Sequence, residues 1–303
     1  RRRRRAAPWN RMRTRRFAMT IAAALLAATC ASCRVGQLRL QPLACAALPP
    51  TTPLVGPRTL GHAHNDYEHP RPLFDALEHG FASVEADLWL RQGQLAVSHD
   101  GWSVRGTLDA LYLAPLGERI ARYGGSVYGD GRPFYLWLDL KQHDPGLEAA
   151  VVAALDRVPY VARFADDGAR PGAVVVVLTG DADADRALVE RPGWRPFVRD
   201  EELLEAAEQH DQPATRRPRA YSLRYGRYLS WSEADGAAND DVAQLRCIVA
   251  QAHAAGRLVR LWDAPEDPRF WRLAARAGVD FVNTDDLEGV ARTLDLVPSL
   301  SAR

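Results

Sequence analysis

The feature that most constrains the fold is a regular alternation of short apolar segments with longer amphipathic ones, from about residue 59 onward. Short segments rich in Val and Leu indicate parallel strands that helices cover. About eight strands in some 240 residues predict an α/β fold, a single-domain TIM (β/α)₈ barrel, rather than an open sheet. The expected strands are Thr59–His64, Ser83–Leu90, Gln94–His99, Phe134–Leu140, Ala173–Thr179, one of Pro196–Arg199 and Arg219–Arg224, Leu258–Trp262, and Asp280–Asn283. The expected helices include Pro72–His79, Gly146–Arg157, Asp240–Ala255 and Pro268–Ala277.

The first 46 residues differ in composition from the rest of the chain. They contain eleven arginines and no acidic residue, and an apolar run extends from Phe17 to Thr29. This run is shorter than the roughly 18 residues that a membrane-spanning helix needs, and it is typical of a signal peptide. We predict that residues 1–46 are a signal peptide or a membrane anchor, that residues 47–57 are a linker, and that residues 58–297 form the barrel. The pair Arg15-Arg16 favours export by the twin-arginine route, to the periplasm, the cell surface or the extracellular space.

The remainder of the chain is acidic. Without the first 46 residues, 28 basic residues face 38 acidic ones, a net charge of about −10. This charge argues against nucleic acid as a partner. It also makes a cation a suitable helper for any anionic substrate.

Acidic side chains alternate with apolar ones on two of the expected strands. Glu85 and Asp87 share one face of their strand, because side chains alternate across a strand. Two acids that point into a barrel without a partner would be costly, and a hard divalent cation, Mg²⁺ or Ca²⁺, removes that cost. Asp139 is the natural third ligand. Lys141 shares its face and is the only lysine in the chain, so an ammonium is expected to assist there.

Histidines end two of the expected strands, at the position where barrel enzymes build their active sites. His62 and His64 would share a face if the first strand stays extended. His99 follows the apolar strand Gln94–Val97 and is followed by Asp100. These histidines are candidates for proton transfer beside the acids.

In order, these motifs resemble the glycerophosphodiester phosphodiesterase and phosphatidylinositol-phospholipase-C-like superfamily, over about residues 56–293. Two motifs are similar to the branch named after altered inheritance of mitochondria protein 6: His64–Tyr67 and Thr107–Leu113. The chain departs from the family where H-R-G becomes His-Ala-His-Asn-Asp, where E-N-T is absent, and where Asp139 replaces the usual Glu, as in the sphingomyelinase D relatives. The wider resemblance rests on Leu73–Leu77, Gly80, Glu85-x-Asp87, Gly93, His99-Asp100, Arg105-Gly106-Thr107, Leu138–Lys141, Trp262 and Gly278–Asp285.

The resemblance implies a metal-dependent phosphoric diester hydrolase that cleaves a glycerophosphodiester, a phospholipid or a related phosphodiester by acid–base catalysis. His99 would be one histidine of the pair, and His62 or His64 the other, a choice that spacing leaves open. Lys141, Trp262 and Asn65 are expected to bind the substrate. A phospholipid substrate would bring the protein to a membrane surface. The departures lie where the head group is read, so they bear on the substrate more than on the chemistry.

Two other functions fit parts of the sequence. His62-x-His64 is also typical of the zinc pair in amidohydrolase-type and polymerase-histidinol-phosphatase-type barrels. Those sites need further histidines on later strands, and after His99 the chain has only His143, His210 and His253. A binding module that has lost catalysis is the other alternative. The complete set of acids and histidines argues against it.

Overall fold

The computed structural model describes residues 60–202, 213–232 and 235–296. The expected signal or anchor, residues 1–46, and the linker, residues 47–57, lie outside the described residues. All described residues belong to one compact unit. Among the described residues, no helix is both long enough and apolar enough to span a bilayer.

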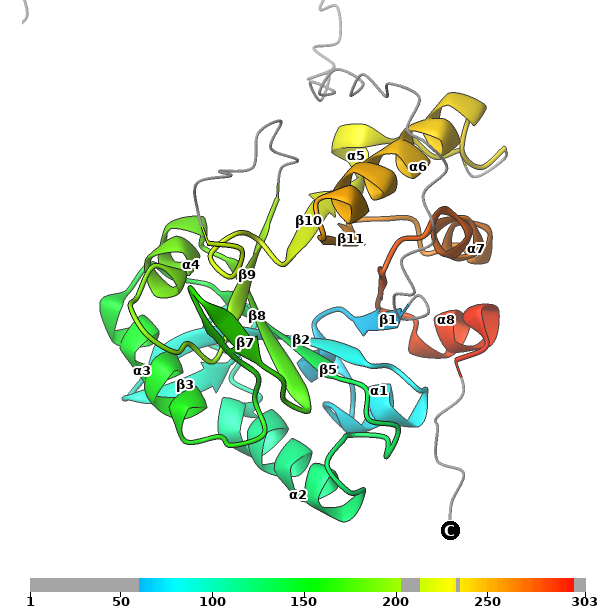
Figure 1. Ribbon diagram of the computed structural model, residues 1–303. Helices are drawn as coiled ribbons and strands as arrows, with labels where there is room; N and C mark the ends of the chain where they lie inside the picture. Colours follow the sequence, from blue (N-terminus) through cyan, green and yellow to red (C-terminus); the bar gives the residue numbers. More distant parts are fainter. Residues whose placement is uncertain (1–59, 203–212, 233–234, 297–303) are drawn as a thin grey trace, which may run out of the picture. The chain divides into compact units, whose positions relative to one another are not determined.

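Eight parallel strands form a closed barrel, which confirms the predicted TIM-barrel fold (Figure 1). The barrel closes where the first strand pairs with the second, with His62 opposite Ser83 and Ala63 opposite Val84. Around the barrel the strands follow the order β1 (Leu60–Ala63), β12 (Phe281–Thr284), β11 (Leu258–Trp262), β10 (Ala220–Arg224), β9 (Val198–Glu201), β8 (Val174–Gly180), β5 (Phe134–Leu140) and β2 (Ser83–Arg91).

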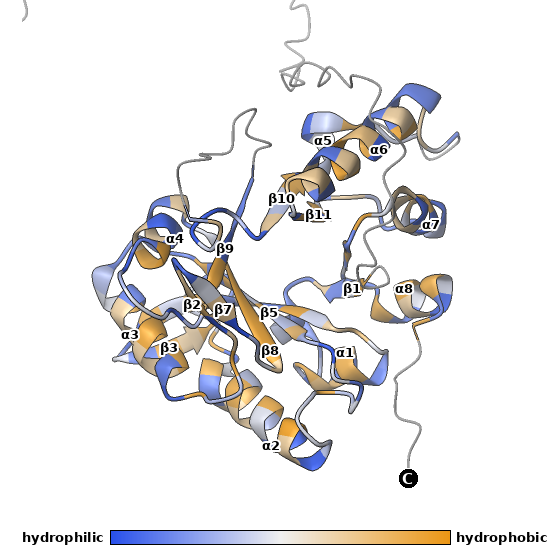
Figure 2. Ribbon diagram, viewed as in Figure 1, coloured by the Kyte–Doolittle hydropathy of each residue, from blue (hydrophilic) through white to orange (hydrophobic). Residues whose placement is uncertain are grey.

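Helices surround the strands and connect them along the chain (Figure 1). Two connecting helices begin in the same way, at Asp144-Pro145 and Asp267-Pro268, where the aspartate accepts a hydrogen bond from a backbone N–H of the first turn. Figure 2 shows hydrophobic residues along β8 and both kinds of residue on the helices, as expected for helices that cover a sheet. The helices are α1 (Phe74–Glu78), α2 (Ala114–Arg122), α3 (Pro145–Asp156), α4 (Ala182–Val189), α5 (Tyr225–Tyr228), α6 (Asn239–Ala254), α7 (Pro268–Ala277) and α8 (Leu287–Leu294), with short turns at η1 (Asp66–Glu68) and η2 (Asp109–Leu113).

The prediction of a barrel strand at Gln94–His99 is wrong. β3 (Gln94–Val97) lies outside the barrel, antiparallel to β2, and β4 (Gly106–Thr107) pairs with it. Only Gln92 and Gly93, both with positive φ, separate β3 from β2. Two residues suffice for a hairpin, whereas a parallel neighbour needs a crossover of roughly a dozen or more. The two segments that were alternatives for the sixth strand both form a strand. Pro196–Arg199 contains the start of β9 and Arg219–Arg224 contains β10, so the barrel has eight strands without β3.

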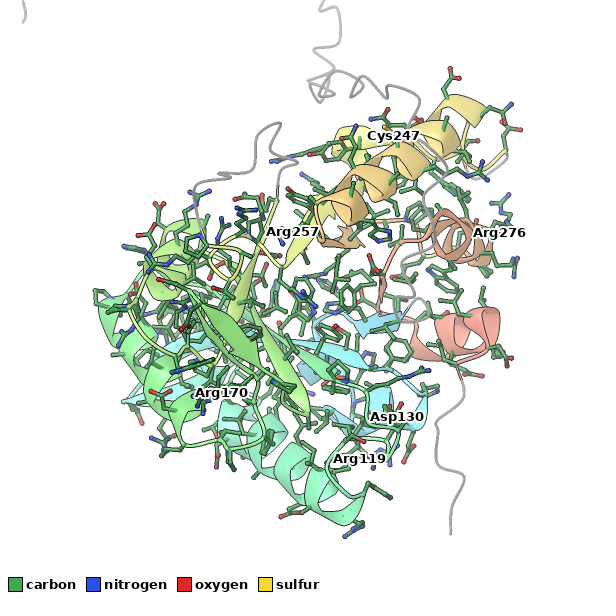
Figure 3. All side chains as sticks on the ribbon, in the orientation of Figure 1. Arg119, Asp130, Arg170, Cys247, Arg257 and Arg276 are labelled. Carbon is green, nitrogen blue, oxygen red and sulfur yellow. The ribbon has the colours of Figure 1, made fainter. Side chains whose placement is uncertain are left out.

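Apolar side chains form two clusters, one on each side of the barrel wall. The larger lies between strands and helices and contains Val84, Ala86 and Leu88 of β2. Side chains fill the interior of the barrel (Figure 3). The smaller cluster, which is buried there, consists of Tyr135, Trp137, Val177, Val198, Ala220 and Phe281.

A second hairpin, which consists of β6 (Arg163–Ala165) and β7 (Gly168–Arg170), precedes β8.

Candidate active site

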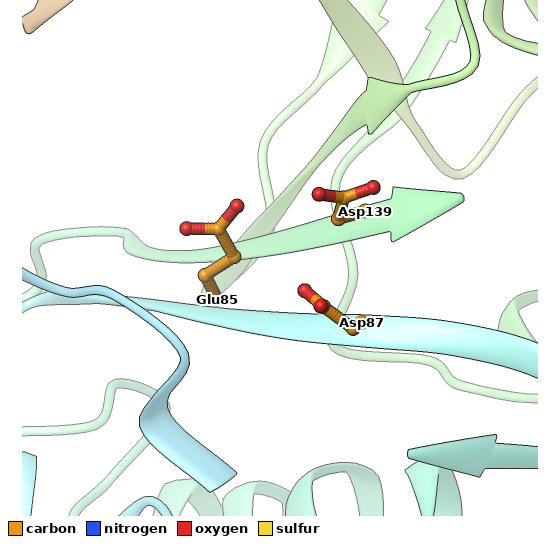
Figure 4. Close-up of side chains that lie close together, drawn as sticks. All are labelled: Glu85, Asp87 and Asp139. Carbon is orange, nitrogen blue, oxygen red and sulfur yellow. The ribbon is translucent and has the colours of Figure 1, made fainter. Parts of the chain in front are cut away.

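Three carboxylates from two neighbouring strands meet inside the barrel. Glu85 and Asp87 lie on β2, and Asp139 lies on β5 in register with Asp87. One oxygen from each carboxylate lies within 4.8 Å of the others. Figure 4 shows the three carboxyl groups directed into the same space. Neighbouring strands are about 4.8 Å apart, so acids in register on their inward faces necessarily come together.

Lys141 lies beside two of these acids. Its Nζ donates to Oδ2 of Asp87 at 2.8 Å and to Oδ2 of Asp139 at 2.7 Å. Burial would lower the pKa of Lys141, but the two carboxylates outweigh burial and raise it, so the amine keeps its charge. Burial raises the pKa of Asp139 to about 6 in spite of Lys141, and Glu85 and Asp87 add to the rise. The pKa of Asp87 is also raised, mainly by burial. The site therefore holds more negative charge than one ammonium neutralises.

Gly180, at the end of β8, makes room for Asp139. Its φ is +101°, and a Cβ at this position would lie 2.2 Å from Oδ1 of Asp139. A contact that short is impossible without displacing the carboxylate, and an L-residue would also be strained at this φ. The carboxylate of Asp139 can therefore occupy its position only because residue 180 is a glycine.

The residues present fit a divalent cation. Oδ1 of Asp87 is buried and, among the described residues, has no hydrogen-bond partner. Carboxylate oxygens are the ligands that Mg²⁺ and Ca²⁺ prefer, and a buried unpaired carboxylate oxygen is costly without a cation. Glu85, Asp87 and Asp139 would hold the ion.

His62 is enclosed in the barrel wall. Its side chain is fully buried, with Nδ1 at 2.7 Å from Oγ of Ser83 and Nε2 at 3.2 Å from Oε2 of Glu85. The ring meets Trp137 edge-on, with 5.4 Å between ring centroids. Burial and the nearby Arg260 lower the pKa of His62 to about 3. With both nitrogens engaged inside the protein, His62 has the geometry of a residue that orients Glu85.

His64 follows β1 and is partly exposed. Its Nδ1 lies 2.9 Å from Oδ1 of Asp285, which follows β12. Burial would lower the pKa of His64, but the hydrogen bond to Asp285 and the charge of Glu85 outweigh it and raise the pKa. Because Asp285 engages Nδ1, Nε2 is the nitrogen that is available for proton transfer.

His99 lies on the loop that follows β3. Its side chain is 66% exposed, and Nδ1 lies 3.3 Å from Oδ2 of Asp87 and 3.4 Å from the hydroxyl of Tyr67. The hairpin explains this position. The N–H of Ser98 donates to the carbonyl of Asp87 at 3.2 Å, so the returning strand carries His99 back to the acid.

The two other expected substrate contacts lie where their strands end. Asn65 has a left-handed backbone, with φ of 44°, and its Oδ1 accepts a hydrogen bond from the Tyr67 hydroxyl at 3.0 Å. Trp262 ends β11 and is half-buried, and its Nε1 donates to the carbonyl of Ser222 at 3.1 Å. Both residues thus border the carboxyl end of the barrel, where a substrate that reaches the acids would enter.

Arg260 is a site residue that the motifs missed. Its Nη2 donates to Oε2 of Glu85 and its Nε donates to Oδ1 of Asn283 at 3.0 Å. A signal was present in the sequence, because Arg260 interrupts the apolar strand Leu258–Trp262 on the face that also carries Trp262. A charge in such a strand is buried only with a partner. Burial would raise the pKa of Glu85, but Arg260 and His62 outweigh it and hold the pKa below its usual value.

The geometry disfavours the zinc alternative. Within residues 60–202, 213–232 and 235–296, the one group with metal-ligand spacing consists of three acids and no histidine. His62 engages Ser83 and Glu85, and His64 engages Asp285. A zinc site of the amidohydrolase type would need both imidazoles on the same ion.

Residues 55–126 match the family profile described as the AIM6-like phosphodiesterase domain. This confirms the resemblance. The matched segment contains all three candidate histidines and two of the three acids, and it carries the signature of a phosphodiesterase domain. Asp139, Lys141 and Trp262 lie beyond it.

Two similar proteins carry the name of the branch that the sequence motifs resemble. Altered inheritance of mitochondria protein 6 from Lachancea thermotolerans is 29% identical over 274 residues, which cover 76% of this chain and 64% of that protein. Its namesake from Eremothecium gossypii is 27% identical over 268 residues, which cover 76% of this chain and 68% of that protein. The chain thus spans about two thirds of the length of these relatives.

A solved structure supports the fold. The crystal structure of a glycerophosphodiester phosphodiesterase from Parabacteroides distasonis matches with a TM-score of 0.50 and 17% sequence identity. The match covers 78% of this chain and 97% of that one. At this level of identity the likeness concerns the α/β barrel and not the substrate.

Proposed function

We propose that this protein is a metal-dependent phosphoric diester hydrolase, with His64 and His99 as its acid–base pair. One observation carries the proposal: the carboxylates of Glu85, Asp87 and Asp139 gather at one point beside the ammonium of Lys141, with His99 in contact with Asp87 and His64 at the end of the neighbouring strand β1. The AIM6-like profile over residues 55–126 supports the same reaction class.

The charges of the site suit a phosphodiester. Three carboxylates face two cations, Lys141 and Arg260, so the cluster retains about one negative charge. A bound divalent cation would supply Lewis-acid stabilisation of the phosphoryl oxygens. Lys141 holds two of the acids in place and adds positive charge where the phosphate would lie.

The two histidines would move the protons. One removes the proton from the attacking hydroxyl, which belongs either to the substrate or to water, and the other protonates the leaving oxygen. Asp285 orients His64 through Nδ1, and Asp87 and Tyr67 contact His99. Each transfer typically contributes 10²–10⁴-fold to the rate. His62 is the weaker candidate for the pair, because it is fully buried and held by Ser83 and Glu85.

The substrate class follows from the resemblance and from the departures from it. A glycerophosphodiester, a phospholipid or a related phosphodiester fits the chemistry of the acids and imidazoles. The replacement of H-R-G by His-Ala-His-Asn-Asp, which includes Asn65, falls where the head group would be read. Asn65 offers an amide there, so we propose a head group that differs from that of the glycerophosphodiesterases.

The arginine-rich residues 1–46 support export as part of the proposal. Either the segment is removed as a signal peptide, or it anchors the protein to a membrane. N-terminal sequencing of the protein from the producing cells would distinguish these forms. An intact N-terminus on protein that is found only in the cytoplasm would refute both.

A panel of phosphodiesters tests the proposed reaction. The panel contains an aryl phosphodiester, glycerophosphodiesters and phospholipids, and phosphorus NMR identifies a cyclic phosphate or a monoester as the product. We expect turnover that a chelator abolishes and that Mg²⁺ or Ca²⁺ restores. Full activity in excess chelator would remove the metal from the proposal, and activity with zinc alone would favour the amidohydrolase alternative.

A further inference from the structure

Large apolar side chains are exposed mainly on one part of the protein. Three of the four such side chains among the described residues lie on the segments that carry the candidate histidines. Trp102 and Val104 belong to the His99 loop, and Phe74 begins α1, just after the loop that starts at His64. The four, with their exposed fractions, are Trp102 (86%), Val104 (50%), Phe74 (47%) and Trp194 (41%).

The loop that carries Trp102 forms a turn that hydrogen bonds to Asp100 fix. The carboxylate of Asp100 accepts hydrogen bonds from the N–H of Trp102 and the N–H of Ser103, both at 2.7 Å. It also accepts from the hydroxyls of Ser103 at 2.9 Å and Ser98 at 3.1 Å. These bonds hold the pKa of Asp100 below its usual range. The backbone from which Trp102 extends into solvent is therefore fixed.

Arginines lie at the base of this turn. Arg91 donates from Nε to the carbonyl of Gly101 at 3.0 Å, and its guanidinium carbon lies 5.9 Å from the centroid of the Trp102 ring. Gly101 has a φ of +78°, and a Cβ there would lie 2.6 Å from Nη2 of Arg91. Arg105, at the other end of the loop, is exposed. The exposed apolar side chains are therefore accompanied by cations.

The two segments form one surface. Arg105 donates from Nε to the carbonyl of Tyr67 at 3.1 Å, and the Tyr67 hydroxyl lies 3.4 Å from Nδ1 of His99. Tyr67 belongs to η1, between His64 and α1. The His99 loop thus packs against η1, and Leu73, which precedes Phe74, donates its backbone N–H to Oδ2 of Asp66 in the same η1.

We propose that this surface, which consists of Phe74, Trp102, Val104, Arg91 and Arg105, binds the face of a phospholipid bilayer. Tryptophan suits the boundary between head groups and acyl chains, because it combines a large apolar ring with a polar N–H. The guanidinium groups complement the lipid phosphates. A protein partner fits less well, since a stable protein interface buries about 800 Å² on each side and two loop tips offer far less.

Binding in this way would bring a lipid phosphodiester to the acids, a consequence that rests on the proposed function. His99 is three residues from Trp102, so insertion of Trp102 places the histidine at the membrane surface. The bilayer contact itself does not depend on catalysis.

The test is binding of the full chain to vesicles of phosphatidylcholine, alone and with phosphatidylserine. We expect Trp102→Ala to lower the partition coefficient about tenfold, the effect of no longer burying one large apolar side chain. Trp102→Phe should retain most of the binding. Trp194→Ala is the matched control, because Trp194 lies between α4 and β9, under the guanidinium of Arg170, which is labelled in Figure 3. It should leave binding unchanged.

Vesicles that contain brominated phosphatidylcholine supply the second readout. The expected export segment, residues 1–46, adds the same background to every variant, so the difference in fluorescence quenching between wild type and Trp102→Ala reports the loop alone. Equal quenching in the two proteins, or equal losses of binding in Trp102→Ala and Trp194→Ala, would overturn the proposal. So would loss of turnover of a water-soluble phosphodiester in Trp102→Ala, since Trp102 would then belong to the substrate site. Absence of turnover in the wild type, with vesicle binding intact, would instead remove only the proposed function.

Discussion

The guanidinium of Arg260 on β11 bonds to the carboxylate of Glu85 on β2 at 2.6 Å, three strands away around the barrel. Both side chains are almost fully buried, and the guanidinium lies 4.9 Å from the centroid of the Trp137 ring. His62 contacts the same carboxylate oxygen. Oε2 of Glu85 is thus held from two sides, which leaves Oε1 for a cation.

Removal of Arg260 should destabilise the fold strongly. Arg260→Leu leaves Glu85 buried without its charge partner, and we expect a loss of about 3–5 kcal/mol in the free energy of unfolding. Urea denaturation measures this loss. Glu85→Gln in the same background should recover part of it, because the amide carries no charge. If the losses of the two single variants simply add in the double variant, the pair is not coupled.

Gly180→Ala should weaken the metal site. The new Cβ would collide with Oδ1 of Asp139, so the carboxylate must leave its present position relative to the other two. We expect the affinity for the activating cation to fall at least roughly tenfold, the scale on which changes around a metal ligand act. Titration with Mg²⁺ or Ca²⁺ measures it. Gly193→Ala is the control, because Gly193 also has a positive φ, +83°, but no atom lies within 4 Å of the added Cβ. Equal effects of the two substitutions would point to backbone strain.

The accessible histidines should be needed for turnover. His64→Ala and His99→Ala should each lower kcat by about 10²–10⁴-fold, because each removes one proton transfer. Circular dichroism should show an intact fold. His143→Ala is the matched control, since His143 is exposed and also contacts an aspartate, Asp181, through Nδ1 at 3.2 Å. A near-normal rate in either test variant removes that histidine from the mechanism.

Asp66 should make stability fall as pH rises. Burial raises the pKa of Asp66 to about 7, although Leu73 N–H and the Tyr112 hydroxyl donate to Oδ2. The folded state therefore keeps a proton that the unfolded state loses near its usual pKa of 3.8. Its contribution to stability is fully present below about pH 4 and is lost as pH rises through 7.

Asp66→Asn tests this assignment, because its neutral amide imitates the protonated acid. Urea midpoints from pH 4 to 8 should decline less in Asp66→Asn than in wild type. Asp167→Asn, an exposed change in the turn between β6 and β7, should follow the wild-type curve. Parallel curves for Asp66→Asn and wild type would show that Asp66 is charged in the folded state at neutral pH.

Cation binding should also be visible without activity. At about 100 times its Kd, a bound ion stabilises the fold by roughly 2.7 kcal/mol. We expect Mg²⁺ or Ca²⁺ to raise the Tm of the wild type and to leave that of Asp139→Asn unchanged. Asp200→Asn serves as the control, because Asp200 is a buried acid that bonds to Thr179 at 2.9 Å outside the acidic cluster. A rise in Asp139→Asn equal to that of wild type would exclude Asp139 as a ligand.

Local patterns in the sequence predicted the barrel and the meeting of the acids. Alternation along β2 puts Glu85 and Asp87 on the face opposite Val84, Ala86 and Leu88, and this period is a property of the extended backbone. The position of His99 depended on the Gln92-Gly93 turn, whose length imposes a hairpin. That signal was also local, and the prediction of a barrel strand overlooked it.

The sequence did not determine whether His62 or His64 belongs to the acid–base pair. His62 lies on β1 and His64 follows it directly, so spacing cannot separate them. Ser83, Glu85 and Trp137 enclose His62, and Asp285 engages His64, all from other strands or from the loops that follow them. Arg260 and Glu85 are 175 residues apart. The sequence by itself determined which side chains face inward, because alternation is local. Only the tertiary structure decided which of them are buried and paired, because burial depends on the strands that become neighbours when the barrel closes.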